Sequence, residues 1–171
     1  DSTEQNRSFI TGIAGRKGYT VITLSKTGMS STPGVLRRIL EIFEKANVNV
    51  EYVPSGIDSL SLVVSSASVA DCLYSLLGEL ERSIKPDHIK TESDLAAVAA
   101  VGRRMAFRPG ISGKIFAALG EKGVNIRMIP QGPEELNILV GVADKNFDQA
   151  IRVLYSRFAK LRQGAQHEAK R

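Results

Sequence analysis

Two features in the first half of the chain have the chemistry of a small-ligand site. Pro33 and Gly34 stand where a helical pattern begins. The first turn of a helix leaves backbone N–H groups unpaired at the positive end of the helix dipole, which suits a carboxylate, and a glycine lets a ligand approach the backbone closely. Glu51, on a predicted strand after this helix, has the charge to bind an ammonium group. The spacing therefore favours a site for a ligand with both charges.

The same residues also have ordinary structural explanations. Proline is favoured in the first turn of any helix. Met29, which precedes the helix, can fill a gap in a core. Glu51 can be an exposed charge on a strand. These alternatives stay open on residue type alone.

Other chemistries have no pattern to support them. The chain contains no Gly-x-x-x-x-Gly-Lys-Ser/Thr phosphate loop, no His-Glu-x-x-His and no cluster of Cys or His. His88 and His167 have no nucleophile pattern beside them, and Cys72 stands alone among apolar neighbours. We therefore expect no catalytic residues, no metal and no cofactor in this chain.

Composition predicts an ordinary globular protein. The 171 residues are 43% hydrophobic and 24% charged. No apolar run approaches the roughly 20 residues of a membrane helix, and the polar residues 1–8 do not form a signal peptide. We therefore expect a cytoplasmic location without a membrane. The net charge of +5 comes from scattered basic residues, so we expect no nucleic-acid partner.

An internal repeat organises the chain. Pro33-Gly34-Val35 recurs as Pro109-Gly110-Ile111, and the same offset of 76 positions aligns further landmarks without a gap. These are Met29 with Met105, Ile39 with Ile115, 48–50 with 124–126, Pro54 with Pro130, Gly56 with Gly132 and Leu60 with Leu136. The offset places Arg127 at the position of Glu51, where a cation would repel ammonium. We therefore expect the second copy of the site to be structural or interfacial.

Each copy predicts the same order of elements, namely strand, helix, strand, strand and helix. Periodicity and chain breakers place them at 20–24, 35–43, 49–53, 60–64 and 69–83, and at 95–101, 111–119, 125–129, 136–142 and 147–158. Asn47 and Gly123 tolerate the left-handed conformation and should end the first helix of each copy. A closing strand at 88–91 completes the first copy only.

The chain also begins with a surplus strand at 8–14, which has no partner within the first copy. Unpaired strand edges are usually removed in folds, so we expect this strand to complete the second sheet. The predicted fold is α+β, with two ferredoxin-like βαββαβ units, the first inserted in the second, and antiparallel sheets with helices on one face. The predicted limits are 15–94 for the first unit, 95–160 plus 8–14 for the second, and 161–171 for a disordered tail.

Three motifs give this chain a family resemblance. They are Gly-Ile-Ala at 12–14, Pro-Ser-Gly-Ile-Asp at 54–58 and Asn-Ile-Arg-Met-Ile at 125–129. In this order they resemble the regulatory, tandem ACT region of monofunctional aspartate kinases, over about residues 9–158. The resemblance implies a regulatory part or subunit of an ATP:L-aspartate 4-phosphotransferase. It also implies feedback inhibition of the first step of lysine, threonine and methionine biosynthesis. The Lys-Phe-Gly-Gly-Thr opening of the kinase's catalytic region is absent from this sequence.

The resemblance also implies an effector site and partners. The effector is a free amino acid, lysine by expectation and threonine as the alternative. Its matching positions here are Met29, Thr32, Gly34, Val35, Leu36, Asn49, Val50 and Glu51, with Ser55, Gly56, Ile57 and Asp58 from a facing chain. The implied partners are a second copy, in a homodimer through ACT units, and a catalytic kinase domain or subunit.

Two alternatives remain beside this reading. One is a free-standing ACT protein that senses an amino acid. The other is an RNA-binding module, because the commonest such domain has the same order of elements and stacks bases on aromatics of its central strands. Tyr52 is the one aromatic residue on the predicted central strands, and the Lys/Arg-Gly-Phe-Gly-Phe pattern is missing, which disfavours this second alternative.

Overall fold

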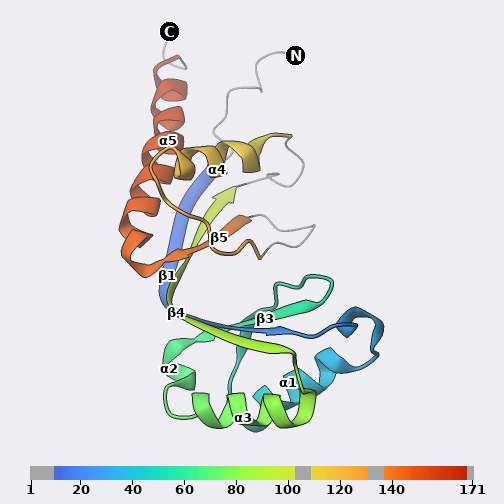
Figure 1. Cartoon of the computed structure of the whole chain (residues 1–171). Helices are drawn as coiled ribbons and strands as arrows, with labels where there is room; N and C mark the ends of the chain where they lie inside the picture. The colour runs from blue at the N-terminus through green and yellow to red at the C-terminus, as the bar shows by residue number, and fades with distance from the viewer. Residues whose placement is uncertain (1–9, 103–108, 131–136, 169–171) are drawn as a thin grey trace. The chain divides into compact units, whose positions relative to one another are not determined.

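The computed structural model describes residues 10–102, 109–130 and 137–168, with side chains to residue 158. It contains a five-stranded sheet in the order β2-β3-β1-β4-β5 (Figure 1). Contacts divide the chain into a central unit, Gly18–Leu95, and a terminal unit, Asp1–Lys17 with Ala96–Arg171. Among the described residues, no helix is long and apolar enough to cross a membrane.

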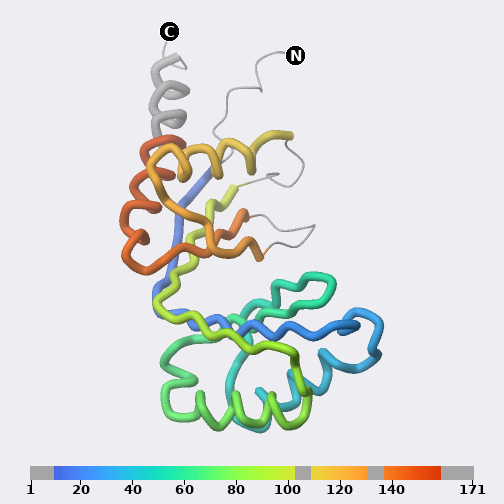
Figure 2. Tube along the Cα trace, in the orientation of Figure 1, coloured from blue at the N-terminus to red at the C-terminus, as the bar shows by residue number. Residues whose placement is uncertain are grey.

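The central unit follows the predicted order of strand, helix, strand, strand, helix and strand, and its trace runs from blue to green in Figure 2. Its elements are the later part of β1 (Ile10–Ser25), η1 (Met29–Ser31), α1 (Val35–Lys45), β2 (Val50–Tyr52), β3 (Ser59–Ser65), α2 (Ser66–Val69), α3 (Leu73–Ile84) and the start of β4 (His88–Gly102). β1 pairs antiparallel with β3, from Tyr19 opposite Ser65 to Ser25 opposite Ser59. β2 also pairs antiparallel with β3, and the register shifts between Val50 and Tyr52. β2 is therefore an edge strand.

One apolar cluster forms the core of the central unit. α1 buries Val35, Ile39, Ile42 and Phe43, which recur at helical spacing. They pack with the buried face of α3 and with alternate residues of β1 and β3. The buried members of the cluster are Ile22, Leu24, Met29, Val35, Ile39, Ile42, Phe43, Val48, Leu60, Leu62, Val64, Val69, Leu76, Leu80 and Ile84.

The helix ends confirm two predictions made from residue type. Asn47 has φ of 55° and Gly123 has φ of 71°, so both adopt the left-handed conformation that ends a helix. The residue after each of them donates its N–H to a carbonyl of the last helical turn: Val48 to Phe43 at 2.9 Å and Val124 to Leu119 at 3.0 Å. The two copies thus end their first helices in the same way.

The terminal unit has a core of its own. Its elements are the start of β1, the end of β4, α4 (Ile111–Gly120), β5 (Asn137–Ala143), η3 (Asp144–Asn146) and α5 (Phe147–Glu168). Ile10 is buried in this core, although the rest of the core follows Leu95 in sequence. The first strand therefore completes the terminal unit, and the fold is two ferredoxin-like units with the first inserted in the second. The division by contacts does not test the predicted limits of the two units, 15–94 and 95–160, which stay predictions.

The predicted strands 8–14 and 20–24 are joined into β1, and 88–91 and 95–101 into β4. Neither junction contains a proline. The residues with positive φ within them, Gly18 at 83° and Asp94 at 57°, do not end the strands.

Three further segments differ from their predictions. The predicted strand 125–129 is reduced to an isolated bridge between Met128 and Gly141, whose missing side chain leaves room for the Met128 side chain. The predicted helix 69–83 is two helices, α2 and α3. α5 continues to Glu168, past its predicted end at Phe158, so helix is present up to there where we predicted a tail. Residues 159–163 are mostly good helix formers, which is the physical reason.

Candidate functional site

A pocket of about 220 Å³ lies at the start of α1. It has one wall from η1 and the helix start and a second wall from the connection between β2 and β3. Its lining residues are Met29, Ser30, Thr32, Gly34, Val35 and Leu36, and, from the second wall, Ser55, Gly56, Ile57, Ser59 and Leu60. Pockets that bind drug-sized ligands have volumes of about 300–1,000 Å³, so this pocket suits a smaller molecule.

The first wall presents an uncapped helix start. Gly34 precedes α1 with φ of 79°, and no side chain caps the helix. The first helical hydrogen bond runs from the N–H of Arg38 to the carbonyl of Gly34 at 3.1 Å, so the N–H groups before Arg38 have no acceptor within the helix. The first turn also contains no acidic residue. This wall therefore presents unpaired N–H groups at a helix start, while carboxylate binding there stays a prediction.

The second wall is a tight turn. Ser55 forms an isolated bridge with Leu60, and the N–H of Gly56 donates to the carbonyl of Ser59 at 2.8 Å. A side-chain carbon at Gly56 would lie 2.7 Å from the Ser59 hydroxyl, which would have to rotate away. Ile57, at its tip, is 80% exposed. The turn thus provides hydroxyl groups and an exposed apolar side chain at the pocket.

The structure brings together most of the predicted site residues within one chain. Met29, Thr32, Gly34, Val35 and Leu36 share the pocket with Ser55, Gly56 and Ile57. Ser55, Gly56 and Ile57 were expected from a facing chain, but here the connection between β2 and β3 forms the second wall of the same chain's pocket. The prediction missed Ser30, Ser59 and Leu60. A signal was available for two of these residues, because Ser30 and Ser59 carry hydroxyl groups and lie next in sequence to predicted residues or motifs.

The structure places the other predicted residues outside this pocket. Asn49, Val50 and Glu51 do not line it, and Asp58 uses a side-chain oxygen to accept the N–H of Gly28 at 3.0 Å. An extended chain rises about 3.3 Å per residue, so Glu51 lies about 13 Å along the chain from Ser55.

Glu51 has a defined partner of its own. Its Oε2 accepts a hydrogen bond from the hydroxyl of Tyr19 at 2.8 Å, and Tyr19 is 2% exposed. The rings of Tyr19 and Tyr52 meet edge to face at 6.3 Å. Glu51 is thus held at the edge strand β2 rather than pointing freely into solvent.

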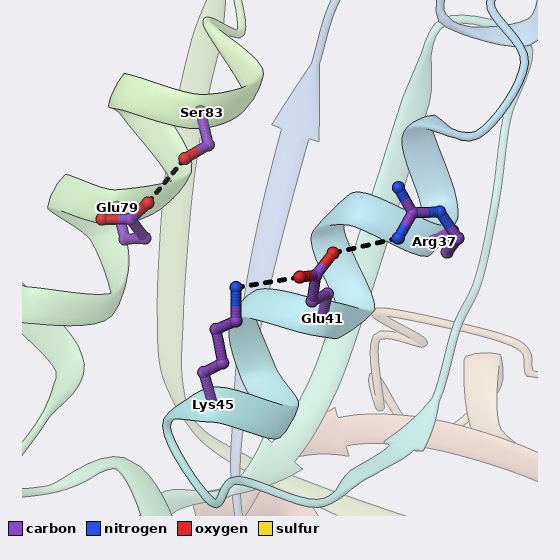
Figure 3. Close-up of polar contacts among 5 residues, drawn as sticks. All are labelled: Arg37, Glu41, Lys45, Glu79 and Ser83. Carbon is purple, nitrogen blue, oxygen red and sulfur yellow. Dashed lines mark hydrogen bonds and ion pairs between the residues drawn. The ribbon is translucent and has the colours of Figure 1, made fainter.

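The outer face of α1 carries linked charges beside exposed leucines. Glu41 pairs with Arg37 at 3.0 Å and with Lys45 at 2.8 Å (Figure 3). The hydrogen bond from Lys45 is the main cause that lowers the pKa of Glu41, and the same bond raises the pKa of Lys45. Leu36 and Leu40, on this face, are 45% and 36% exposed. Since Leu36 also lines the pocket, the pocket and this face adjoin.

Glu79 makes a comparable surface arrangement on α3. It accepts a hydrogen bond from the Ser83 hydroxyl at 2.6 Å, as Figure 3 shows, and pairs with Arg82 at 2.6 Å. The Ser83 hydrogen bond is the main cause that lowers the pKa of Glu79. Each of these pairs joins neighbouring turns of the same helix, so the pairs on α1 stabilise α1 and the pairs on α3 stabilise α3. The charged residues of these pairs form no part of the pocket.

The corresponding site of the second copy is described only in part. Gly110 begins α4 with φ of 82°, as Gly34 begins α1. Arg127 stands at the position of Glu51, and its N–H donates to the carbonyl of Gly141 at 2.7 Å. The equivalents of the pocket loops, 103–108 and 131–136, lie outside the described residues. Within the described part of the chain, no group of three or more His, Cys, Asp or Glu could hold a metal ion.

Comparison with known proteins agrees with this architecture. The model of the ACT domain family matches residues 98–158. Aspartokinase 3 of Bacillus subtilis is 33% identical over 150 residues, which are 87% of this chain and 33% of that protein. The aspartate kinase of Clostridium acetobutylicum, described as an allosteric enzyme, superposes with a TM-score of 0.86 at 41% identity, over 92% of this chain and 37% of that one. This chain thus spans about a third of these relatives.

Two further structures bear on the role of the region. A chain from the aspartokinase alpha and beta subunits matches with a TM-score of 0.76 and 30% identity, and the match covers 88% of this chain and 99% of that one. Escherichia coli aspartokinase III, solved with lysine and aspartate in its T-state, matches with a TM-score of 0.73 and 27% identity, over 92% of this chain and 34% of that one. The chain therefore belongs to the aspartokinase family, in which it is the regulatory ACT region.

Proposed function

We propose that this chain binds a free amino acid, lysine in the first instance, and that binding inhibits aspartate phosphorylation by a kinase domain or subunit outside these residues. The observation that carries the proposal is the pocket at the start of α1, where an uncapped helix start faces a turn rich in Ser and Gly. Lysine is favoured over threonine by the E. coli relative solved with lysine.

The ligand's carboxylate would bind the N–H groups of the first turn of α1. These groups are preorganised by the helix, and the dipole adds to their attraction for an anion. Apolar walls from Met29, Val35 and Leu36 would contact the aliphatic part of the ligand. The pocket lining contains no acidic residue. An ammonium group therefore needs a partner from elsewhere.

We assign that role to Glu51 of a second copy. Among the described residues β2 has a neighbour on one side only, and edge strands are usually covered. If two copies paired antiparallel about Val53, the residue after β2, Glu51 of one copy would lie opposite Ser55 of the other. Tyr19 already donates to Glu51, but a carboxylate accepts about four hydrogen bonds, so this bond leaves capacity for an ammonium group.

The exposed leucines of α1 support the same assembly. Leu36 and Leu40 lie beside alternating charges from Arg37, Glu41 and Lys45. In a two-fold assembly the same face meets itself, so leucines can contact leucines while opposite charges on the two copies meet. The proposed dimer would thus complete the pocket and cover this apolar surface. Sedimentation tests it: a monomer at high micromolar concentration, with and without lysine, would contradict it.

Ligand identity is tested first by stability. Melting temperatures are measured with each of the twenty amino acids, because a ligand that binds the folded state alone raises apparent stability. We expect lysine to give the largest rise. If no amino acid raises the melting temperature, the proposed function is wrong. If threonine gives the largest rise, the sensor stands and its effector changes.

The role of Glu51 is tested by calorimetric titration at one salt concentration. A charge-assisted hydrogen bond contributes about 1.5–3 kcal/mol, so Glu51→Gln should weaken lysine binding by roughly 10- to 100-fold. Glu81→Gln, an exposed carboxylate on α3, is the matched control and should bind as the wild type does. Equal affinities in both variants would remove Glu51 from the site.

A further inference from the structure

The segment just before the pocket, residues 25–28, is held by residues far away in sequence. We call it the pocket turn. It leads directly into the first wall, because Met29 donates its N–H to the carbonyl of Lys26 at 3.0 Å and the Thr32 hydroxyl donates to the carbonyl of Gly28 at 2.9 Å. The positions of Met29 and Thr32 therefore depend on the position of this turn.

Asp87 binds the pocket turn from one side. Its Oδ2 accepts both the N–H of Thr27 at 2.8 Å and the hydroxyl of Thr27 at 2.9 Å. Its own N–H donates to the carbonyl of Ser25 at 2.8 Å. Lys26 adds a bond from its ammonium group to the carbonyl of Lys85 at 2.8 Å. The segment between α3 and β4 thus holds each residue from 25 to 27.

Asp58 binds the pocket turn from the other side. Its carbonyl accepts the N–H of Lys26 and its Oδ1 accepts the N–H of Gly28, both at 3.0 Å. Asp58 lies between Ile57 and Ser59, which line the second wall. This pair of bonds therefore ties the two walls of the pocket together through the turn.

We propose that Asp87 is a positioning residue of the effector pocket, which it serves by holding the pocket turn in place without contacting the ligand. This inference rests on the proposed function, since it takes the pocket as the effector site. A ligand that contacts both walls binds more tightly when their spacing is set in advance, because less conformational freedom is lost on binding. Asp87 sets that spacing together with Asp58.

The position of Asp87 also gives the site a route to the rest of the chain. Asp87 immediately precedes β4, the strand that begins in the central unit and continues into the terminal unit. A ligand that pulls the two walls together acts on the pocket turn, and the turn is bonded to the residue that begins β4. Asp87 thus joins the pocket turn to a strand shared by both units.

The test compares four variants of the full chain by two measurements. Asp87→Ala removes both bonds to Thr27, Asp87→Asn keeps an oxygen but not the charge, and Thr27→Val removes only the hydroxyl donor. Asp71→Ala, at an exposed aspartate between α2 and α3, is the matched control. Hydrogen exchange at the Thr27 and Gly28 amides reports on the turn without a ligand, and calorimetric titration with lysine reports on the pocket.

We expect Asp87→Ala to speed exchange at Thr27 and Gly28, with the amides of β3 and α3 unchanged, and to weaken lysine binding about tenfold. That factor corresponds to a turn correctly placed about one tenth of the time. Asp87→Asn and Thr27→Val should lie between wild type and Asp87→Ala. An unchanged number of binding sites in the titration shows that the variant is folded.

Three results overturn the inference. Lysine affinity equal in Asp87→Ala and Asp71→Ala refutes the positioning role alone, while wild-type binding upholds the proposed function. Absence of amino-acid binding by the wild type refutes the proposed function and the inference with it. If Asp87→Ala does not fold, Asp87→Asn and Thr27→Val decide: wild-type affinity in both overturns the positioning role, and weakened affinity in both supports it.

Discussion

Replacing Gly34 by alanine should destabilise the central unit through the backbone alone. Gly34 has φ of 79° and ψ of 4°, and a side-chain carbon added there meets no atom within 4 Å. The left-handed conformation costs a non-glycine residue about 1–2 kcal/mol. Alanine also restricts the unfolded chain, which offsets about 0.4–1 kcal/mol of this cost. The free energy of unfolding should therefore fall by about 1 kcal/mol.

Two further substitutions make the test specific. Asparagine visits the left-handed region more readily than alanine, so Gly34→Asn should cost less than Gly34→Ala. Gly113→Ala lies inside α4, without positive φ and with open space around it, so it should raise stability by up to about 1 kcal/mol. The assay is urea unfolding at 25 °C followed by circular dichroism.

Lysine affinity is measured on the same variants. Gly34 lines the pocket, and its conformation directs the first turn of α1 at the ligand. If alanine shifts this backbone out of the left-handed region, the helix start moves and lysine affinity falls. The reasoning is refuted if Gly34→Ala is as stable as the wild type, or if asparagine costs as much as alanine.

Three other predictions follow from the structure. Hydrogen bonds from Thr27, mainly from its N–H, lower the pKa of Asp87. The contribution of Asp87 to stability is therefore present above the ordinary aspartate pKa of about 3.9, and it is lost as the pH falls through the lower pKa of the folded state. The gap in urea midpoint between wild type and Asp87→Asn should thus shrink from pH 7 to pH 3, and a constant gap would contradict this. Leu80→Ala, at a fully buried position, should cost about 2–5 kcal/mol in urea unfolding, whereas Tyr74→Ala, at an exposed one, should stay within about 0.5 kcal/mol. Deleting residues 1–14 removes Ile10, which is buried in the terminal core, and Ile13, which packs against it, so we expect aggregation or a broadened thermal transition, and a melting curve like that of the parent would be evidence against the interleaved fold.

Local rules in the sequence determined the two-unit architecture. The helices at α1 and α4 follow from apolar residues at helical spacing, and their ends follow from residues that tolerate positive φ, Asn47 and Gly123. The repeat then carried each assignment from one copy to the other. Such features are readable because they depend on neighbours within one or two turns of chain.

The candidate site could be predicted from the sequence to the same extent as the fold. The helix start at Gly34 and the Pro-Ser-Gly-Ile-Asp motif each have a local signal, and both line the pocket. Glu51 was identified by its charge, but no local pattern indicated that Tyr19 donates to it from another strand. Residue type thus located the walls of the site and not the connections around them.

Only the tertiary structure decided how distant segments meet. The bonds of Asp58 and Asp87 to the pocket turn join residues about 30 and 60 positions apart. Such contacts depend on strand register and on the packing of α3 against the sheet, which no local pattern specifies because each short segment is compatible with several registers. The sequence by itself therefore determined which elements form, and the register between them determined which carboxylates hold the pocket.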